Sequence, residues 1–332
     1  MDVTIKDIAE VAGVSVATVS RVLNNKDNVR KETKDKVMDI AKELNYQADF
    51  NARSLKTNKT HTLGLIIPDL TNPFYAQTSS IIENVVHDLG YSTIICNTNN
   101  QPKLQDEYIN ILRQRRVDGI IFGSARIDDK SITDLKTKNV PYITYHRCLK
   151  KGDTNYITTD DVKGIKQAVD YLVSCGHKKI AFLSGPRIYS TSIERLRGFL
   201  QARKEYNLDF DPDLIRDGEF VEEKAWEETQ NLINLTDPPT AIIAANDIMA
   251  LGALDCCIKS GLSVPQDISI IGYDDIYISS HARIQLTTVS VHPEKIARKT
   301  AELFVKKVLT KENSESVQLR LDPKLIIRNT TA

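Results

Sequence analysis

From residue 63 onward, short apolar segments alternate with longer amphipathic ones. The first apolar series covers residues 63–67, 92–96, 118–122 and 141–145, with helical patterns between them near 74–89, 102–115 and 130–138. A second series covers residues 155–159, 179–184, 240–245 and 268–273. Apolar strands that alternate with helices are typical of parallel sheets covered on both faces. The two series therefore predict two similar α/β lobes within residues 61–332.

The first 46 residues show a different pattern, that of three short helices. Thr4 precedes the first helix and Asp7 follows three residues later, which is capping-box spacing. Gly13 interrupts the pattern, and Ser15 is a good N-cap for a second helix. The inward residues at helical spacing are Ile5, Ile8, Ala9, Val14, Val19, Val22, Leu23, Val37, Ile40, Ala41 and Leu44. This pattern fits a helix-turn-helix, and it fits a generic three-helix bundle about equally well.

The exposed side of the second helix favours DNA binding over the generic bundle. It is free of acidic residues and carries short groups that allow a helix to enter a major groove. Its residues are Val16, Ala17, Thr18, Ser20 and Arg21. Candidates for phosphate contacts are Ser15, Thr18, Arg30, Lys31 and Lys34. Because the whole chain has 44 basic and 44 acidic residues, DNA affinity must depend on where the charges lie.

Several other classes of protein lack their usual signals. The sequence contains no G-x-S-x-G, P-loop, G-x-G-x-x-G or H-E-x-x-H motif, so we expect neither an enzyme nor a cofactor. The five cysteines include no C-x-x-C pair, which disfavours a metal site and a disulfide framework. Neither an export signal nor a stretch of about 18 apolar residues is present, so we expect a cytoplasmic protein that does not enter the membrane. An exported sugar carrier is disfavoured for the same reason.

The segment TIKDIAEVAGVSVATVSRVLN, residues 4–24, resembles the amino-terminal signature of the lactose-repressor/galactose-repressor family of bacterial transcription regulators. Residues 49–57, DFNARSLKT, resemble the hinge helix of that family, and Leu55 matches the leucine that wedges into the minor groove. The plainer interpretation of Leu55 is a buried leucine, but its neighbours are polar. The resemblance implies these DNA-binding residues: Thr4, Ser15, Val16, Ala17, Thr18, Ser20, Arg21, Asn24, Arg30, Asn51, Arg53, Leu55 and Lys56.

The remaining residues resemble the type 1 periplasmic-binding-protein fold, whose chain crosses between its lobes three times. The fold class expected is thus an all-α helix-turn-helix headpiece with a hinge helix, followed by an α/β sensor of two parallel-sheet lobes. The expected domains are residues 1–48 for DNA binding, 49–60 for the hinge helix and linker, and 61–332 for effector binding and dimerisation. The lobes are expected at about 61–161 plus 290–320, and at 162–289 plus 321–332.

Ligands of open α/β folds bind at the carboxyl ends of strands, where this chain places aromatic, amide, carboxylate and guanidinium groups. The residues of the expected effector site are Asp69, Asn72, Phe74, Tyr75, His146, Arg147, Ser190, Thr191, Arg195, Phe220, Asn246 and Asp274. Alternative interpretations remain for some of this region. Phe220 could belong to the core, and Asp247 and Asp275 could cap the helices that follow them.

Three positions depart from the family pattern. Ala48-Asp49 replaces the usual Pro-Asn at the start of the hinge, His146 stands where an acid usually precedes Arg147, and Val291 replaces a residue that is polar in some relatives. The histidine between arginines fits an anionic effector such as a sugar phosphate, or a group that titrates near neutral pH. We favour the plainer interpretation of His146, a peripheral loop residue.

Together these features predict a ligand-controlled repressor of a carbohydrate-utilisation operon. The resemblance implies a homodimer, or a higher oligomer, that binds a near-palindromic operator. The effector expected is a sugar or sugar phosphate. The alternative is a global carbon-catabolite regulator whose co-repressor is a phosphorylated carrier protein.

Overall fold

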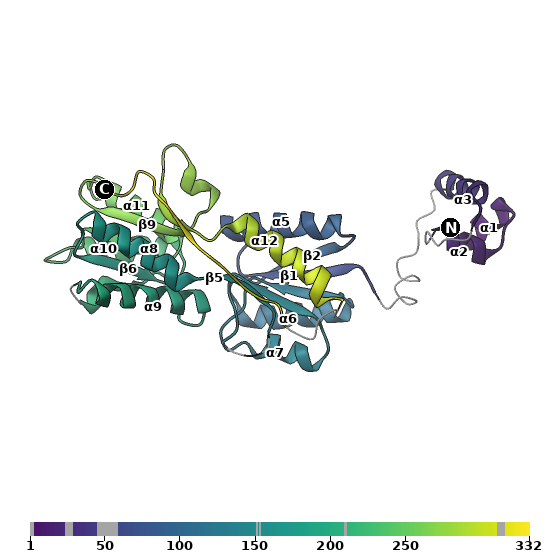
Figure 1. Cartoon of the computed structure of the whole chain (residues 1–332), viewed down its shortest axis with the longest axis horizontal. Helices are drawn as coiled ribbons and strands as arrows, with labels where there is room; N and C mark the ends of the chain where they lie inside the picture. The colour runs from purple at the N-terminus through teal and green to yellow at the C-terminus, as the bar shows by residue number, and fades with distance from the viewer. Residues whose placement is uncertain are drawn as a thin grey trace. The chain divides into compact units, whose positions relative to one another are not determined.

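The computed structural model describes residues 3–23, 29–44, 59–150, 152, 154–208, 211–310 and 316–332. Contacts divide the chain into two units, Met1–Thr60 and His61–Ala332, which are described separately (Figure 1). Over the described ranges, no helix is both long enough and apolar enough to cross a membrane.

The first unit contains helices α1 (Ile5–Ala12), α2 (Val16–Leu23) and α3 (Lys31–Glu43). As predicted, Asp7 accepts hydrogen bonds from the backbone N–H and the hydroxyl of Thr4, both at 2.7 Å. Gly13 ends α1 with a φ of 67°, and the Ser15 hydroxyl accepts from the Thr18 N–H at 3.1 Å. The buried core of this unit is Ile8, Ala9, Ala12, Val19, Val22, Val37, Ile40 and Ala41. The expected caps and inward face of the helix-turn-helix are therefore confirmed.

The first lobe of the second unit is built on a parallel sheet in the order β11-β5-β4-β3-β1-β2. Its strands are β1 (Thr62–Ile67), β2 (Ser92–Asn97), β3 (Gly119–Phe122), β4 (Tyr142–Tyr145), β5 (Tyr156–Thr159) and β11 (Gln318–Leu321). Its helices are α5 (Pro73–Asp88), α6 (Pro102–Gln114), α7 (Lys130–Thr137) and α12 (Pro293–Leu303), with a π-helical turn at Phe304–Val308. Helices α5 and α12 cover one face of the sheet, and α6 and α7 cover the other (Figure 1).

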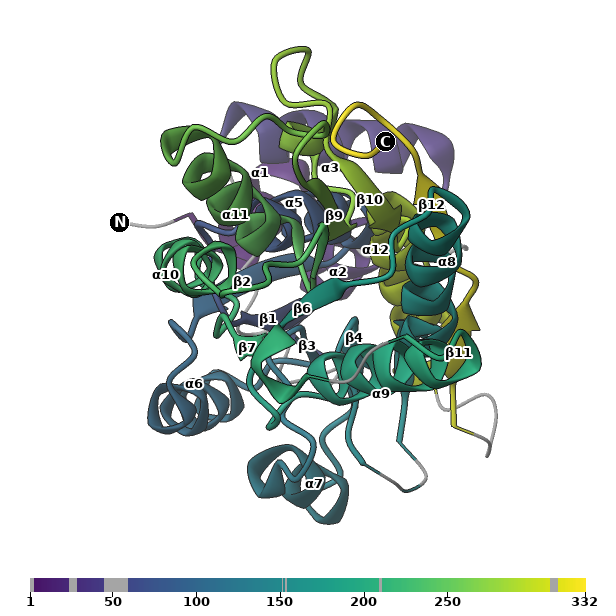
Figure 2. The same ribbon diagram turned by 90° about the vertical axis from the view of Figure 1, so that its left-hand side faces the viewer.

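The second lobe repeats this plan with the order β12-β10-β9-β8-β6-β7, in which only β12 runs antiparallel to its neighbour. Its strands are β6 (Ile180–Ser184), β7 (Ile215–Asp217), β8 (Ala241–Ala244), β9 (Ser269–Asp274), β10 (Thr287–Ser290) and β12 (Lys324–Ile326). Its helices are α8 (Asp161–Ser174), α9 (Ser190–Glu205), α10 (Glu222–Ile233) and α11 (Asp247–Lys259), with short 3₁₀ turns at Pro212–Leu214 and Tyr277–Ser280. Figure 2 shows β12 beside α8, where the Leu325 N–H donates to Gln167.

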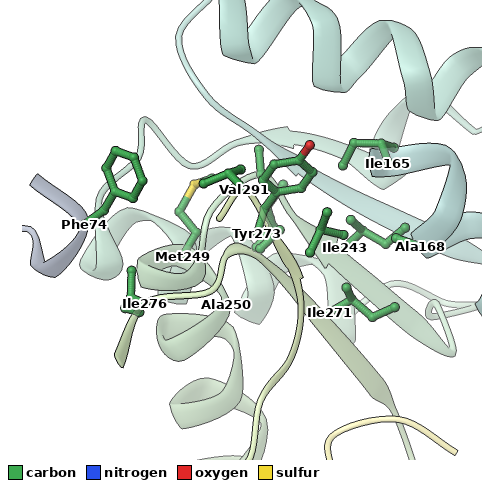
Figure 3. Close-up of a cluster of buried hydrophobic side chains, with 14 of the residues drawn as sticks. Phe74, Ile165, Ala168, Ile243, Met249, Ala250, Ile271, Tyr273, Ile276 and Val291 are labelled. Atoms are coloured by element: carbon green, nitrogen blue, oxygen red, sulfur yellow. The ribbon is translucent and has the colours of Figure 1, made fainter. Parts of the chain in front are cut away.

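The chain passes between the two sheets three times: from β5 to α8, from β10 to α12, and from β11 to β12. Inner strands such as β3 and β8 are apolar on both faces because helices cover both, and β8 and β9 are buried along their whole length. Figure 3 shows Ile243 and Ile271 of this core beside Ile165 and Ala168 of α8. The hinge helix predicted at 49–57 lies outside the described residues, which resume at residue 59 within the expected linker.

Candidate functional site

A cleft lined by residues of both lobes is the best candidate for a binding site. Its lining residues are Pro68, Asp69, Asn72, Tyr75, Asn100, His146, Arg147, Arg195, Phe220, Asn246 and Asp274. A second hollow lies along α9 and is lined by Ile193, Leu196 and Leu200 together with long polar side chains. That hollow has no convergent polar groups, whereas specific ligand sites combine apolar walls with a few placed polar groups.

The parallel strands explain why these side chains meet. Asp69 follows β1, His146 and Arg147 follow β4, and Asn246 and Asp274 stand at the ends of β8 and β9. In parallel α/β sheets the carboxyl ends of the strands lie on one edge, and here those edges of the two sheets meet at the cleft.

Arg195, on the first turns of α9, is the centre of the charged cluster in the cleft. Only 1% of its surface is exposed, and its guanidinium bonds Asp161 at 3.0 Å and Asp274 at 3.1 Å. It also donates to the Ala245 carbonyl and stacks on Tyr273, 3.8 Å from the ring centroid. Two carboxylates therefore share one arginine in a buried site.

Burial raises the pKa of Asp274 to about 7, although the positive charge of Arg195 acts to lower it. Burial also raises the pKa of Asp161.

His146 is part of this cluster, so its interpretation as a peripheral loop residue is wrong. The side chain is 6% exposed, its ring centroid lies 4.3 Å from that of Phe74, and its Nε2 is 3.9 Å from an Asp274 oxygen. Its φ of 64° belongs to the left-handed region, and this turn lets the Arg147 N–H bond the Tyr145 carbonyl. Burial, together with the charges of Arg195 and Arg147, lowers the pKa of His146 well below its usual value, so the ring is neutral at pH 7.

Arg147 lies among aromatic rings. Its guanidinium carbon is 3.6 Å from the Tyr189 ring centroid, 5.6 Å from that of Phe220 and 5.7 Å from that of Tyr75. The Tyr189 hydroxyl donates to Asn100 at 3.3 Å, which holds that ring in place. Phe220 is held against Gly185, where an added Cβ would lie 2.5 Å from the ring. Phe220 is therefore a wall of the cleft that also packs on the core.

The amide and the neighbouring carboxylates have distinct functions. Asn246 caps α11 by accepting from the Met249 N–H at 2.9 Å, and it also lines the cleft. The interpretation of Asp247 as a helix cap is wrong, because its buried carboxylate accepts from the Ile276 N–H and from the Ser279 and Thr288 hydroxyls. Asp275 does not cap a helix either and instead pairs with Arg328 at 2.7 Å.

Nine of the expected effector residues line the cleft, and three do not. Phe74 is buried behind His146, Thr191 is buried in α9, and the Ser190 hydroxyl accepts from the Cys148 N–H at 2.9 Å. The sequence prediction missed Pro68 and Asn100. Asn100 belongs to the polar run that follows β2, so the rule that ligands bind at the carboxyl ends of strands could have found it.

The helix-turn-helix unit exposes most of the expected DNA contacts that the structure describes. Val16, Ala17 and Arg21 are exposed along α2, and no acidic residue lies within that helix. Thr4, Ser15 and Arg30 are also exposed, while Thr18 and Ser20 are half-buried. The other expected DNA contacts lie outside the described residues: Asn24, Asn51, Arg53, Leu55 and Lys56.

Comparison with known proteins identifies relatives of both units. A family model described as bacterial regulatory proteins, lacI family, matches residues 4–49, and one described as a periplasmic binding protein-like domain matches residues 169–331. The HTH-type transcriptional repressor PurR of Histophilus somni (strain 129Pt) is 35% identical over 328 residues, which is 98% of each chain.

Two solved structures are similar along almost the whole chain. The lac repressor dimer bound to operator and the anti-inducer ONPF is 29% identical, with a TM-score of 0.90 over 100% of this chain and 99% of that chain. The transcriptional regulator CelR in complex with cellobiose is 29% identical, with a TM-score of 0.76 over 99% of each chain. These similarities confirm the fold class expected from the sequence.

Proposed function

Because the chain belongs to the LacI family of bacterial regulatory proteins, we propose that it represses a carbohydrate-utilisation operon under the control of a small effector. At the level of the family it is a DNA-binding transcriptional repressor. The effector in this proposal is a sugar or sugar phosphate bound in the cleft. The observation that carries the proposal is the buried cluster of Arg195, Asp274 and His146, which opens into a cleft in a chain that also has an acid-free DNA-reading helix.

The DNA half of the proposal assigns α2 to the major groove. Val16, Ala17 and Arg21 are its exposed residues, and Thr4, Ser15 and Arg30 are placed for phosphate contacts. Leu55 is proposed as the minor-groove wedge on its sequence context alone. The chain acts as a homodimer in this proposal, with one helix-turn-helix on each half of a near-palindromic operator in the cytoplasm. The lac repressor structure, which is a dimer on its operator, supports this arrangement.

The effector half rests on the chemistry of the cleft. Carboxylate, amide and guanidinium groups bond vicinal hydroxyls, while aromatic faces pack against the C–H faces of a sugar ring. Asp274, Asn246 and Arg195 supply the polar groups, and Phe220 and Tyr75 supply the rings. The cellobiose complex of a related regulator supports a carbohydrate ligand for this architecture.

Selection of binding sites from random duplex DNA tests the DNA half. The full chain is expected to enrich a near-palindrome, and Leu55→Ala should bind that site much more weakly while its effector affinity stays nearly intact. A sequence pool without symmetry would contradict paired half-sites, and equal operator affinity of the variant would contradict the wedge.

A thermal-shift screen of the full chain against sugars and sugar phosphates tests the effector half, because a ligand that binds the folded state raises Tm. Each hit should change operator affinity, and this change should disappear in Asp274→Ala. A matched control is Asp275→Ala, which removes a neighbouring carboxylate that does not line the cleft. A response that survives in Asp274→Ala would show that the effector binds elsewhere.

A further inference from the structure

The buried guanidinium of Arg147 has no counter-ion among the residues that the structure describes. The residue is 5% exposed, and its Nε and Nη1 atoms have no hydrogen-bond partner within the part of the chain that the structure describes. The rings of Tyr189, Phe220 and Tyr75 surround it. Aromatic faces attract the cation but leave the N–H groups at the edge of its plane without an acceptor.

The carboxyl groups of the cleft have direct partners other than Arg147. Arg195 lies between the carboxyl groups of Asp161 and Asp274, and those bonds are 3.0 and 3.1 Å long. Asp69 accepts from the backbone N–H and hydroxyl of Thr71 at 2.8 and 2.7 Å, within its own loop. His146 carries no positive charge because its pKa is lowered by burial and by both arginines. Among the described residues of the cleft, Arg147 is therefore a buried cation that contacts no carboxylate.

The surrounding loops hold Arg147 in this position. The left-handed backbone at His146 turns the chain so that both side chains enter the cleft, and the Cys148 N–H bonds the Ser190 hydroxyl at 2.9 Å. Tyr189 is itself fixed by its bond to Asn100. The hydroxyl of Tyr75, also buried and unpartnered among the described residues, is a second donor in the cleft. Buried charges in folded proteins are normally paired, and a direct partner is what the guanidinium of Arg147 lacks among the described residues.

We propose that Arg147 is the docking point for an oxyanion of the effector, so that the effector is a phosphorylated or carboxylated polyhydroxy compound rather than a neutral sugar. The planar fork of a guanidinium matches two oxygens of a phosphate or carboxylate. Its stacking on Tyr189 leaves the edge of the fork available to such a group. The hydroxyl groups of the same compound would then bond Asp274 and Asn246 across the cleft. This inference rests on the proposed effector function of the cleft.

The test uses the full chain and simple oxyanions as probes. Tm is measured with inorganic phosphate and with acetate, at tens of millimolar, against sodium chloride of matched ionic strength. The proteins compared are the wild type, Arg147→Gln and the control Arg187→Gln, which removes an exposed arginine from the loop before α9. Phosphate or acetate is expected to raise the Tm of the wild type and the control but not that of Arg147→Gln. Equal responses in all three proteins, or no response beyond that of chloride, would overturn the proposal.

A second experiment compares charged and neutral ligands that share one sugar skeleton. Glucose 6-phosphate against glucose tests a phosphate group, and glucuronate against glucose tests a carboxylate group. The charged member is expected to bind at least tenfold more tightly, with the preference lost in Arg147→Gln. If that variant does not fold, Arg147→Lys keeps the charge without the fork and should lower the preference. A neutral sugar that binds through Asp274 with no loss in either variant would overturn the oxyanion while leaving the proposed function standing. Operator binding that responds to no cleft ligand would instead contradict the proposed function.

Discussion

Replacing Arg195 with alanine is the most direct test of the charged cluster. The side chain is almost fully buried and holds four partners: Asp161, Asp274, the Ala245 carbonyl and the Tyr273 ring. The substitution leaves two carboxyl groups in a buried site with no cation between them. Removing one partner of a buried ion pair costs about 3–5 kcal/mol of folding free energy, because the remaining charge has neither water nor a counter-ion.

The size of the loss is expected to depend on pH. Burial already raises the pKa of both carboxyl groups, to about 7 for Asp274. Without Arg195 they keep their protons to a still higher pH in the folded chain, whereas in the unfolded chain they ionise near pH 4. A carboxyl group that holds its proton only in the folded state lowers stability as pH rises, by about 1.4 kcal/mol per pH unit. The deficit of Arg195→Ala should therefore be larger at pH 8 than at pH 5.5, by roughly 1–3 kcal/mol.

Urea denaturation followed by tryptophan fluorescence measures this difference. The chain has a single tryptophan, Trp226, and it lies on α10 of the second lobe, so its signal reports on the unit that contains the cleft. The control is Arg197→Ala, which removes an exposed arginine of the same helix whose one ion pair within the described ranges is to Glu194, at 3.8 Å. The control should cost less than about 1 kcal/mol at either pH. An Arg195→Ala loss no larger than that of the control, or one that shrinks as pH rises, would refute the reasoning.

Three further outcomes are expected from other single changes. Gly185→Ala places a Cβ 2.5 Å from the Phe220 ring, so it should weaken effector binding and cost about 1–3 kcal/mol in a denaturation experiment; unchanged affinity would mean that Phe220 is not a wall of the site. Asp274→Asn removes a carboxyl group with a pKa of about 7. The free energy of unfolding of the variant should therefore not show the decline that this group gives the wild type between about pH 4 and pH 7. Parallel pH profiles from urea midpoints would contradict this. Arg21→Ala should weaken operator binding by about 1–3 kcal/mol in gel-shift titrations if it contacts a base, and a loss equal for all DNA sequences would identify a phosphate contact instead.

The sequence predicted the elements whose residue pattern alone determines their structure. Strands such as β1 and β8 are apolar throughout because helices cover both faces, and an uninterrupted apolar run indicates that environment. The caps of the first unit were equally predictable, since Thr4, Asp7 and Gly13 act on residues a few positions away. Asp274, Asn246 and Arg195 could be placed in one site because the carboxyl ends of parallel strands converge.

Features that depend on distant partners escaped the sequence prediction. Strand β10 reads Thr-Thr-Val-Ser, yet it is fully buried because the Thr288 hydroxyl bonds Asp247 and the Thr287 hydroxyl bonds Thr331. Asp247 is the first residue of α11, a position where an aspartate is usually interpreted as a cap. Its hydrogen-bond partners instead lie 29 to 41 residues away in the sequence. His146 was misjudged because its burial follows from one left-handed residue and from Phe74, neither of which leaves a periodic signal.

The position of the charged cluster explains how a small ligand could act on the whole second unit. Asp161 is the first residue of α8 after the β5 crossing, and Asp274 pairs in register with Ser290, the last residue of β10 before the crossing to α12. Arg195 bonds both carboxyl groups, so one side chain links the start of α8 to a residue that lies beside the end of β10. Helix α12 then packs beside α5 on the first lobe. A ligand that bonds Asp274 or Arg195 would therefore act beside two of the crossings. It would shift the lobes only if its affinity differed between two arrangements of them. Coupling by this route needs no path through the hydrophobic cores, because the groups that would bind the ligand contact or adjoin the ends of the crossings.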